Sequence, residues 1–157
     1  MPVKPIPEGY HSVTPYLIVK GGANAIEFYK KAFGATEIMR FEGPGGALGH
    51  AEIRIGNSPV MLADEYPDMG FRSPQTLGGA GVSLMVYVEQ VDAVFQRAIA
   101  AGAKELRAVQ NQFYGDRSGT LQDPFGHVWT ISTHVEDIPP EEMHRRSQEM
   151  VKQAQKK

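Results

Sequence analysis

The sequence predicts an α+β fold made of two tandem copies of one strand–helix–strand–strand–strand unit. In the first half, a strand-like segment at residues 16–19 precedes a helical segment and three further strand-like segments, and the second half repeats this order from residue 85. The glycines that end the two helical segments, Gly34 and Gly102, are separated by the same number of positions as Val60 and Val128. A long unit present only twice is not a solenoid, which needs several short repeats. Because paired modules usually build a shared cleft, the repeat predicts a small-molecule site made from both halves.

The first unit is expected to occupy about residues 10–65 and to follow an irregular arm. The first strand is predicted at residues 11–19, where Pro15 indicates an edge position or a kink. Asn24 is a candidate N-cap for a helix that Gly34 ends. Alternation of polar and apolar residues and intervening turn residues predict three more strands, at residues 35–41, 48–55 and 59–63.

A linker at residues 66–80, rich in glycine and proline, leads to the second unit at about residues 81–134. The tail at residues 139–155 predicts a polar helix whose thin apolar stripe lies on the surface or against a partner chain. The second unit has the same predicted order as the first, with a strand at residues 82–88, a helix at 91–101 and strands at 105–109, 118–122 and 127–133.

Length and composition exclude several classes of protein. The 157 residues predict a single domain that is long enough to bury its own core. The net charge is -2 and the sequence has no basic stripe, so nucleic acid is not an expected partner. No apolar run approaches the roughly 20 residues of a membrane span, and the start lacks a signal peptide's apolar stretch, so a cytoplasmic protein is expected. The absence of cysteine excludes disulfides, thiolate nucleophiles and cysteine-ligated zinc.

The strand at residues 50–55 carries the first functional candidates. Its odd-numbered residues are apolar and its even-numbered residues polar, so His50, Glu52 and Arg54 should share the face opposite the core. His50 and Glu52 could act as a base with an orienting partner, or donate two metal ligands. An ordinary solvated sheet face with a His50–Glu52 hydrogen bond, or with Glu52 paired to Arg54, would show the same pattern, and both interpretations stay open.

Two stretches resemble a known family. Residues 16–35 are similar to the strand–helix opening of the vicinal oxygen chelate superfamily, and residues 114–129 resemble its closing hairpin. With His50-Ala51-Glu52 and the internal repeat, the likeness covers about residues 10–137 and is closest to the glyoxalase/bleomycin-resistance-like branch often described as PhnB-like. The resemblance implies two βαβββ modules that form an open, eight-stranded, barrel-like cleft in a homodimer. Its members include metal-dependent lyases and isomerases, dioxygenases, fosfomycin-modifying transferases and metal-free proteins that sequester drugs.

The resemblance also implies where a metal would be bound. The usual ligand positions, matched residue by residue, fall at four places: Thr14, near Leu62, Ser83 (or Met85) and Thr130. None of these is a histidine or a carboxylate, and a divalent transition metal needs about three such donors. No cofactor is therefore expected, although His50 and Glu52 could hold a relocated metal.

The remaining candidates come from strands that line the cleft in relatives. Arg117 could clamp an anionic substrate beside Tyr114, or contribute together with Asp116 to holding the turn. An aromatic and adaptable wall for an organic ligand would come from Tyr16, Met85, Tyr87 and Thr130.

Three functional hypotheses follow. The first is a metal-independent protein that binds a small organic molecule, as a homodimer. The second is a glyoxalase-like lyase or isomerase that uses His50 and Glu52 as base or relocated metal ligands. The third is an interaction module that docks through its C-terminal helix.

Overall fold

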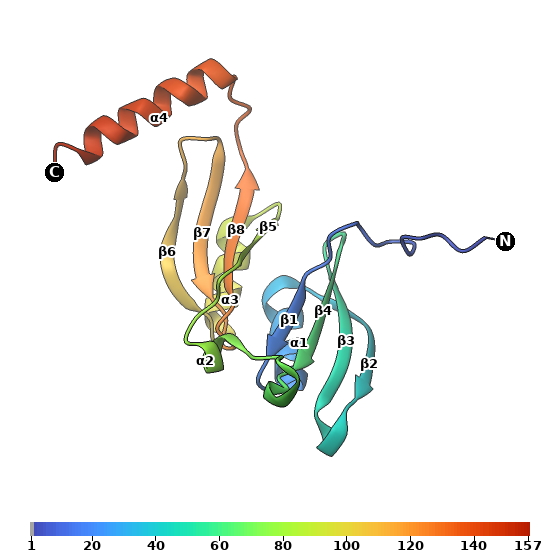
Figure 1. Cartoon of the computed structure of the whole chain (residues 1–157). Helices are drawn as coiled ribbons and strands as arrows, with labels where there is room; N and C mark the ends of the chain where they lie inside the picture. The colour runs from blue at the N-terminus through green and yellow to red at the C-terminus, as the bar shows by residue number, and fades with distance from the viewer. Residues whose placement is uncertain (1) are drawn as a thin grey trace.

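In a computed structural model, which describes residues 2–157, the chain forms two modules of the same design (Figure 1). The predicted α+β fold with two tandem βαβββ units and a C-terminal helix is confirmed. The first module consists of β1 (Tyr16–Val19), α1 (Gly22–Phe33), β2 (Thr36–Glu42), β3 (Leu48–Ile55) and β4 (Ser58–Asp64). The second module consists of β5 (Ser83–Tyr87), α3 (Val91–Ala100), β6 (Lys104–Asn111), β7 (Asp116–Gln122) and β8 (Val128–His134).

The strand order is the same in both sheets. It is β1-β4-β3-β2 in the first and β5-β8-β7-β6 in the second, and in each sheet the first strand pairs in parallel with the last. The remaining pairs are antiparallel. The eight strands therefore form two curved sheets with free edges, and not a closed barrel.

The start of the first module differs from the prediction. The first strand begins at Tyr16 and not at residue 11, and α1 begins at Gly22 with Gly21 as its N-cap. The helix begins before Asn24 because the Asp64 carboxylate, at the end of β4, accepts the backbone N–H groups of Gly21 and Gly22 at 2.9 and 2.6 Å. A carboxylate at a helix N-terminus satisfies orphan donors and complements the helix dipole. The prediction that Asn24 caps this helix was therefore wrong.

The linker and the tail contain short or exposed helices. The 3-10 turn at Pro67–Met69 and α2 (Pro74–Leu77), both in the linker, were not predicted, whereas the 3-10 turn at Pro44–Gly46 falls among the turn residues predicted between the second and third strands. The tail forms α4 (Pro140–Ala154), which has no buried residue and leads away from the second module (Figure 1). Arg146 ties it to Glu136 and to the Phe113 carbonyl. Across residues 2–157, no helix combines the length and apolarity that a membrane crossing requires.

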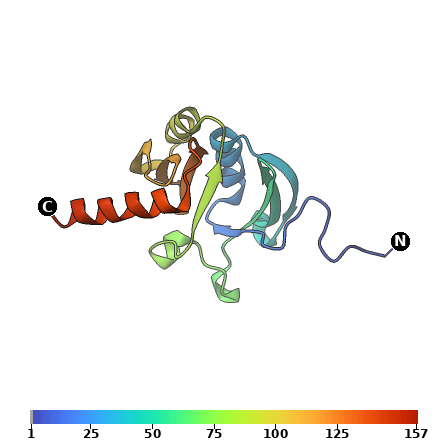
Figure 2. The ribbon, with the colours of Figure 1, turned by 90° about the horizontal axis from the view of Figure 1, so that it is seen from above.

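The two modules meet through their helices and through one turn. Viewed from above, α1 and α3 lie side by side, with the sheets on either flank (Figure 2). Between them, the Trp129 ring of β8 lies 5.5 Å from Tyr29 and 4.9 Å from Phe33, both on α1. The Arg97 side chain of α3 also donates to the Ala32 carbonyl at 3.1 Å.

The buried carboxylate of Asp123 joins these parts. One of its oxygens accepts the Tyr29 hydroxyl at 2.6 Å and the Trp129 indole N–H at 2.9 Å. The other accepts the backbone N–H groups of Phe125 and His127 within its own turn. Burial, followed by the charge of Asp123, raises the pKa of the Tyr29 hydroxyl well above its usual range, so this hydroxyl stays a donor.

We expect Asp123→Ala to lower the free energy of unfolding by about 3–5 kcal/mol, because it leaves several buried donors without an acceptor. Tyr29→Phe, which removes one donor, should cost about 1 kcal/mol. Urea unfolding followed by tryptophan fluorescence measures both. Asp68→Ala, at an exposed position, is the matched control and should change stability by less than about 0.5 kcal/mol. An Asp123→Ala protein as stable as this control would contradict the assignment.

Candidate functional site

A chain of four polar side chains lies on the face of the first sheet that α1 does not cover. His50 and Glu52 point to this face from β3, as the alternation predicted, and they bond to each other at 3.1 Å through His50 Nε2 and Glu52 Oε1. The other imidazole nitrogen, Nδ1, lies 2.7 Å from the Tyr16 hydroxyl. The second oxygen of Glu52 accepts the hydroxyl of Tyr10, which belongs to the N-terminal arm. Arg54 does not pair with Glu52.

The partners assign the proton positions. The Tyr10 hydrogen bond lowers the pKa of Glu52, burial of the carboxylate acts in the opposite direction, and His50 adds to the lowering. An ionised Glu52 accepts the Nε2–H of His50, so the Nδ1 of a neutral His50 is free to accept the Tyr16 hydroxyl. Burial raises the pKa of Tyr16, and the Glu52 charge raises it further, so Tyr16 is the donor at neutral pH. The arrangement can relay a proton from Tyr16 toward Glu52.

An apolar cavity of about 410 Å³ opens beside this chain. Tyr16 lines it from β1, and the linker contributes three exposed apolar residues, Tyr66, Met69 and Phe71. Two carboxylates border the cavity, but both are bound to the protein itself. Asp64 accepts three backbone N–H groups, and Glu65 accepts the Ser73 N–H and the Thr76 hydroxyl.

The second sheet carries a related cluster. The buried Asp116 carboxylate accepts the hydroxyls of Tyr87 and Ser132 at 2.9 and 3.2 Å and contacts His134 Nδ1 at 2.8 Å. His134 Nε2 also lies 2.9 Å from Asp137. Because both ring nitrogens face carboxylates, the imidazolium form, which donates twice, fits this position best.

The predicted site residues therefore fall into separate groups. Met85 and Tyr87 are exposed on β5, and Thr130 shares a hydrogen bond of 3.0 Å with the Thr120 hydroxyl on the same sheet. Tyr114 packs edge-on against Phe113 in the turn between β6 and β7. Arg117 does not bond to Asp116; it binds Asp92 of α3 through two hydrogen bonds of 2.8 Å and Asn111 of β6 through one of 3.2 Å. Successive strand residues face opposite ways, which separates the two side chains.

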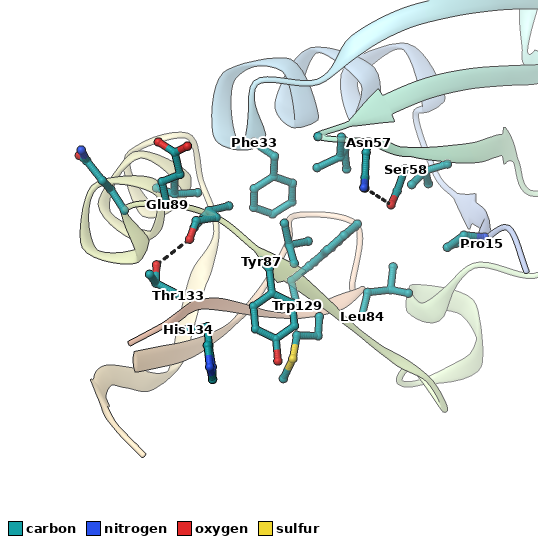
Figure 3. A pocket seen from close by; sticks show the side chains of 18 of the residues that line it. Pro15, Phe33, Asn57, Ser58, Leu84, Tyr87, Glu89, Trp129, Thr133 and His134 are labelled. Atoms are coloured by element: carbon teal, nitrogen blue, oxygen red, sulfur yellow. Dashed lines mark hydrogen bonds between the residues drawn. The ribbon is translucent and has the colours of Figure 1, made fainter. Parts of the chain in front are cut away.

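A wide groove of about 1220 Å³ also runs between the modules. Figure 3 shows Phe33 and Trp129 along it, with His134 toward one end and Pro15 toward the other. One wall is β5, an edge strand of the second sheet. Tyr87 and His134 of the second cluster line this groove, and within residues 2–157 no hydrogen bond joins the clusters of the two modules.

The residues at the family's metal positions do not fit a metal centre. Leu62 is fully buried on the core side of β4, so its neighbour Met61, paired with Tyr16, occupies the open face. Met85 and Thr130 pair in the same way on the second sheet. Threonine, methionine and tyrosine side chains are poor ligands for divalent transition metals. Residues 2–157 contain no cluster of three or more histidine or carboxylate side chains placed to hold a metal ion.

The chain is a paired βαβββ protein, because it consists of two four-stranded modules in which a helix packs against each sheet. Within that class, the chain belongs to the Glyoxalase/Bleomycin resistance protein/Dioxygenase superfamily, whose family model matches residues 9–131. The family predicted from the sequence is thus confirmed.

One relative is similar to the chain in sequence, and two solved structures are similar to it in fold. An uncharacterised protein of Mycobacterium bovis is 44% identical over 135 residues, which cover 84% of this chain and 89% of the relative. The structure of TioX from Micromonospora sp. ML1 is similar with a TM-score of 0.62 at 22% identity, covering 82% of this chain and 100% of TioX. The PhnB protein from Bacillus cereus has a TM-score of 0.61 at 22% identity, covering 78% of this chain and 99% of that protein. These two likenesses show a shared fold.

Several residues of the site were not predicted. Tyr10 lies in a segment without periodicity, and nothing local connects it to a strand more than 40 positions away. Tyr66, Met69 and Phe71 had a weak signal, since they are large apolar residues in a linker otherwise rich in glycine and proline. No signal in the sequence indicated the hydrogen bonds of Asp116.

His134 gives the second sheet a pH dependence. Hydrogen bonds to Asp116 and then Asp137 raise the pKa of His134, so its stabilising effect is complete below the unfolded value of about 6.5 and is lost as the pH rises through the folded value. Thermal melts should therefore show His134→Gln less stable than the wild type at about pH 6, with a smaller difference at about pH 9. His144→Gln, an exposed histidine on α4, is the control. A difference that does not change with pH would contradict this account.

Proposed function

We propose that the protein binds a small organic molecule, without the usual metal of its superfamily, in the cavity beside Tyr16. The observation that carries this proposal is the cavity itself, which has an aromatic wall and lies next to a chain of polar groups. Its volume of about 410 Å³ falls within the range of small-molecule sites. A few polar groups at one end of an apolar pocket are typical of sites that orient an organic ligand.

The charges at the cavity narrow the class of ligand. The protein's own N–H and hydroxyl groups already bond to Asp64 and Glu65, so these carboxylates have fewer acceptor positions for a ligand. Among residues 2–157, no lysine or arginine lines the cavity to bind an anion. A flat, uncharged ligand that stacks on Tyr66 or Phe71 and reaches Tyr16 with a polar group fits this lining.

We also infer that the protein acts as a homodimer. Phe41, Met85 and Tyr87 are 60%, 49% and 62% exposed on the open faces of the sheets, and the groove between the modules exposes further apolar surface. Exposed apolar surface of this kind is typical of an interface, and a second copy of the chain could cover it. Sedimentation equilibrium, which would give the monomer mass if the inference is wrong, tests it.

The neutral fluorescent probe N-phenyl-1-naphthylamine should bind the cavity and gain fluorescence. We expect Phe71→Ala to weaken its binding about fivefold to tenfold, because one aromatic contact contributes about 1 kcal/mol. Leu77→Ala is the matched control, since Leu77 is an exposed apolar residue of the same linker that does not line the cavity. Equal affinity in the two variants, or no probe binding to the wild type, would count against the proposed site.

The proton relay supports a second candidate, a glyoxalase-like lyase or isomerase. Tyr16 could take a proton from a carbon next to a carbonyl while its own hydroxyl proton passes to His50 Nδ1, and Glu52 would stabilise the imidazolium that forms. Tyr16 is 46% exposed beside the cavity, so a ligand there can reach it.

This candidate makes its own prediction. If hemithioacetals or α-hydroxyketones are turned over, Glu52→Gln should lower kcat about 100-fold with little change in KM, because the carboxylate stabilises charge only as the proton moves. Steady-state kinetics of His50→Ala, Glu52→Gln and the Leu77→Ala control measure this. Activity that survives both site substitutions unchanged would exclude the relay.

A further inference from the structure

The N-terminal arm is held to the site by one side chain. Residues 2–9 are exposed, and the arm leads away from the first sheet (Figures 1 and 2). Within residues 2–157, the Tyr10–Glu52 bond is the only hydrogen bond between residues 2–10 and the rest of the protein, and no ion pair adds to it. A hydrogen bond to a charged group contributes about 1.5–3 kcal/mol, so the arm can leave the sheet at modest cost.

Tyr10 contacts Glu52 through the hydroxyl group of its phenol ring. A turn closed by the Tyr10 N–H and the Pro7 carbonyl, at 3.1 Å, directs the ring onto β3. Gly9 takes a positive φ of 82° there, and a side chain at this position would lie only 3.3 Å from the Arg54 guanidinium. The phenol hydroxyl makes the contact with the carboxylate, while the Tyr10 backbone N–H is bonded within the arm itself.

Each oxygen of the Glu52 carboxylate has one hydrogen-bond partner. Its Oε1 is used by His50, and its Oε2 accepts the Tyr10 hydroxyl. Around this point the sheet is aromatic, with Phe41 stacked on His50 at 6.4 Å and Tyr16 tilted against it at 5.4 Å. A phenol donates more strongly to a carboxylate than an aliphatic alcohol does, because its proton is more acidic.

We propose that the arm is a displaceable strap, in which the Tyr10 phenol occupies a subsite for an aromatic hydroxyl group of the ligand. A ligand of this class donates its O–H to Glu52 Oε2 in place of Tyr10, and its apolar remainder extends past Tyr16 into the aromatic cavity. The inference rests on the proposed binding function and names the chemistry of the ligand at one end of the site.

The test uses p-cresol, the side chain of tyrosine as a free molecule, and toluene, the same molecule without the hydroxyl. Each is titrated into the ¹⁵N-labelled full-length chain while the amide signals of Ala51 and Ile53, the neighbours of Glu52, are followed. The variants are Tyr10→Ala, Tyr10→Ala with Glu52→Gln, and His11→Ala, an exposed neighbour in the same arm, as the control. Thermal melts check that each variant is folded.

If the strap fills the subsite about 90% of the time, Tyr10→Ala should bind p-cresol about tenfold more tightly than the wild type. Toluene should bind this variant about tenfold more weakly than p-cresol, and Glu52→Gln should remove that preference. His11→Ala should match the wild type. Equal p-cresol affinity in the wild type and Tyr10→Ala, or equal affinity for p-cresol and toluene, would overturn the strap.

The naphthylamine probe separates this failure from failure of the proposed function. If the probe binds the wild type and Tyr10→Ala alike while p-cresol gains nothing, the strap is wrong and the cavity remains a binding site. If the probe does not bind the wild type, the proposed binding function itself is wrong. Probe binding together with a p-cresol gain that depends on Glu52 supports both.

Discussion

The arrangement of the two modules depends on the buried carboxylate of Asp123. It accepts hydrogen bonds from Tyr29 of the first module and from Trp129 of the second, so one charged group fixes α1 against the turn between β7 and β8. The same turn presents His127, whose Nε2 lies 2.9 Å from the Ile18 carbonyl of β1. Since β1 also carries Tyr16, the position of the candidate site on the first sheet is linked to a turn of the second module.

The duplication extends to the chemistry of the open faces, and the two copies have diverged. In each module, a tyrosine of the first strand, a histidine and a carboxylate of the third strand form one hydrogen-bonded cluster. The carboxylate is Glu52 in the first module and Asp116 in the second. Asp116 receives all its donors from its own module, so its cluster stabilises the sheet and the start of the tail. Glu52 receives one donor from its own strand and one from the arm. This difference makes the first sheet the better candidate for ligand binding.

The sequence predicts those features that depend on neighbouring residues. The alternation from His50 to Ile55 was enough to place His50 and Glu52 together on the open face, and glycine correctly ended α1. The Asn24 prediction failed because the carboxylate that accepts the first N–H groups of α1 belongs to Asp64, on a strand distant in the sequence. The Asp123 network and the Tyr10–Glu52 bond join positions 94 and 42 residues apart, and no local pattern encodes such a pairing. A buried polar residue finds its partner only once the chain has folded.

The buried carboxylates of the chain show which site remains open to a ligand. Asp123 accepts four hydrogen bonds and Asp116 contacts three donors, all from ordered strands, helices and turns. An ionised carboxylate in such surroundings is costly to expose or to re-pair, because every donor would lose its acceptor at once. Glu52 has two donors, and one of them, Tyr10, lies on a segment with no other hydrogen bond to the described fold. Glu52 is therefore the buried acid that can change its partner without disturbing the modules, and it lies in the sheet beside the cavity that an organic molecule would enter.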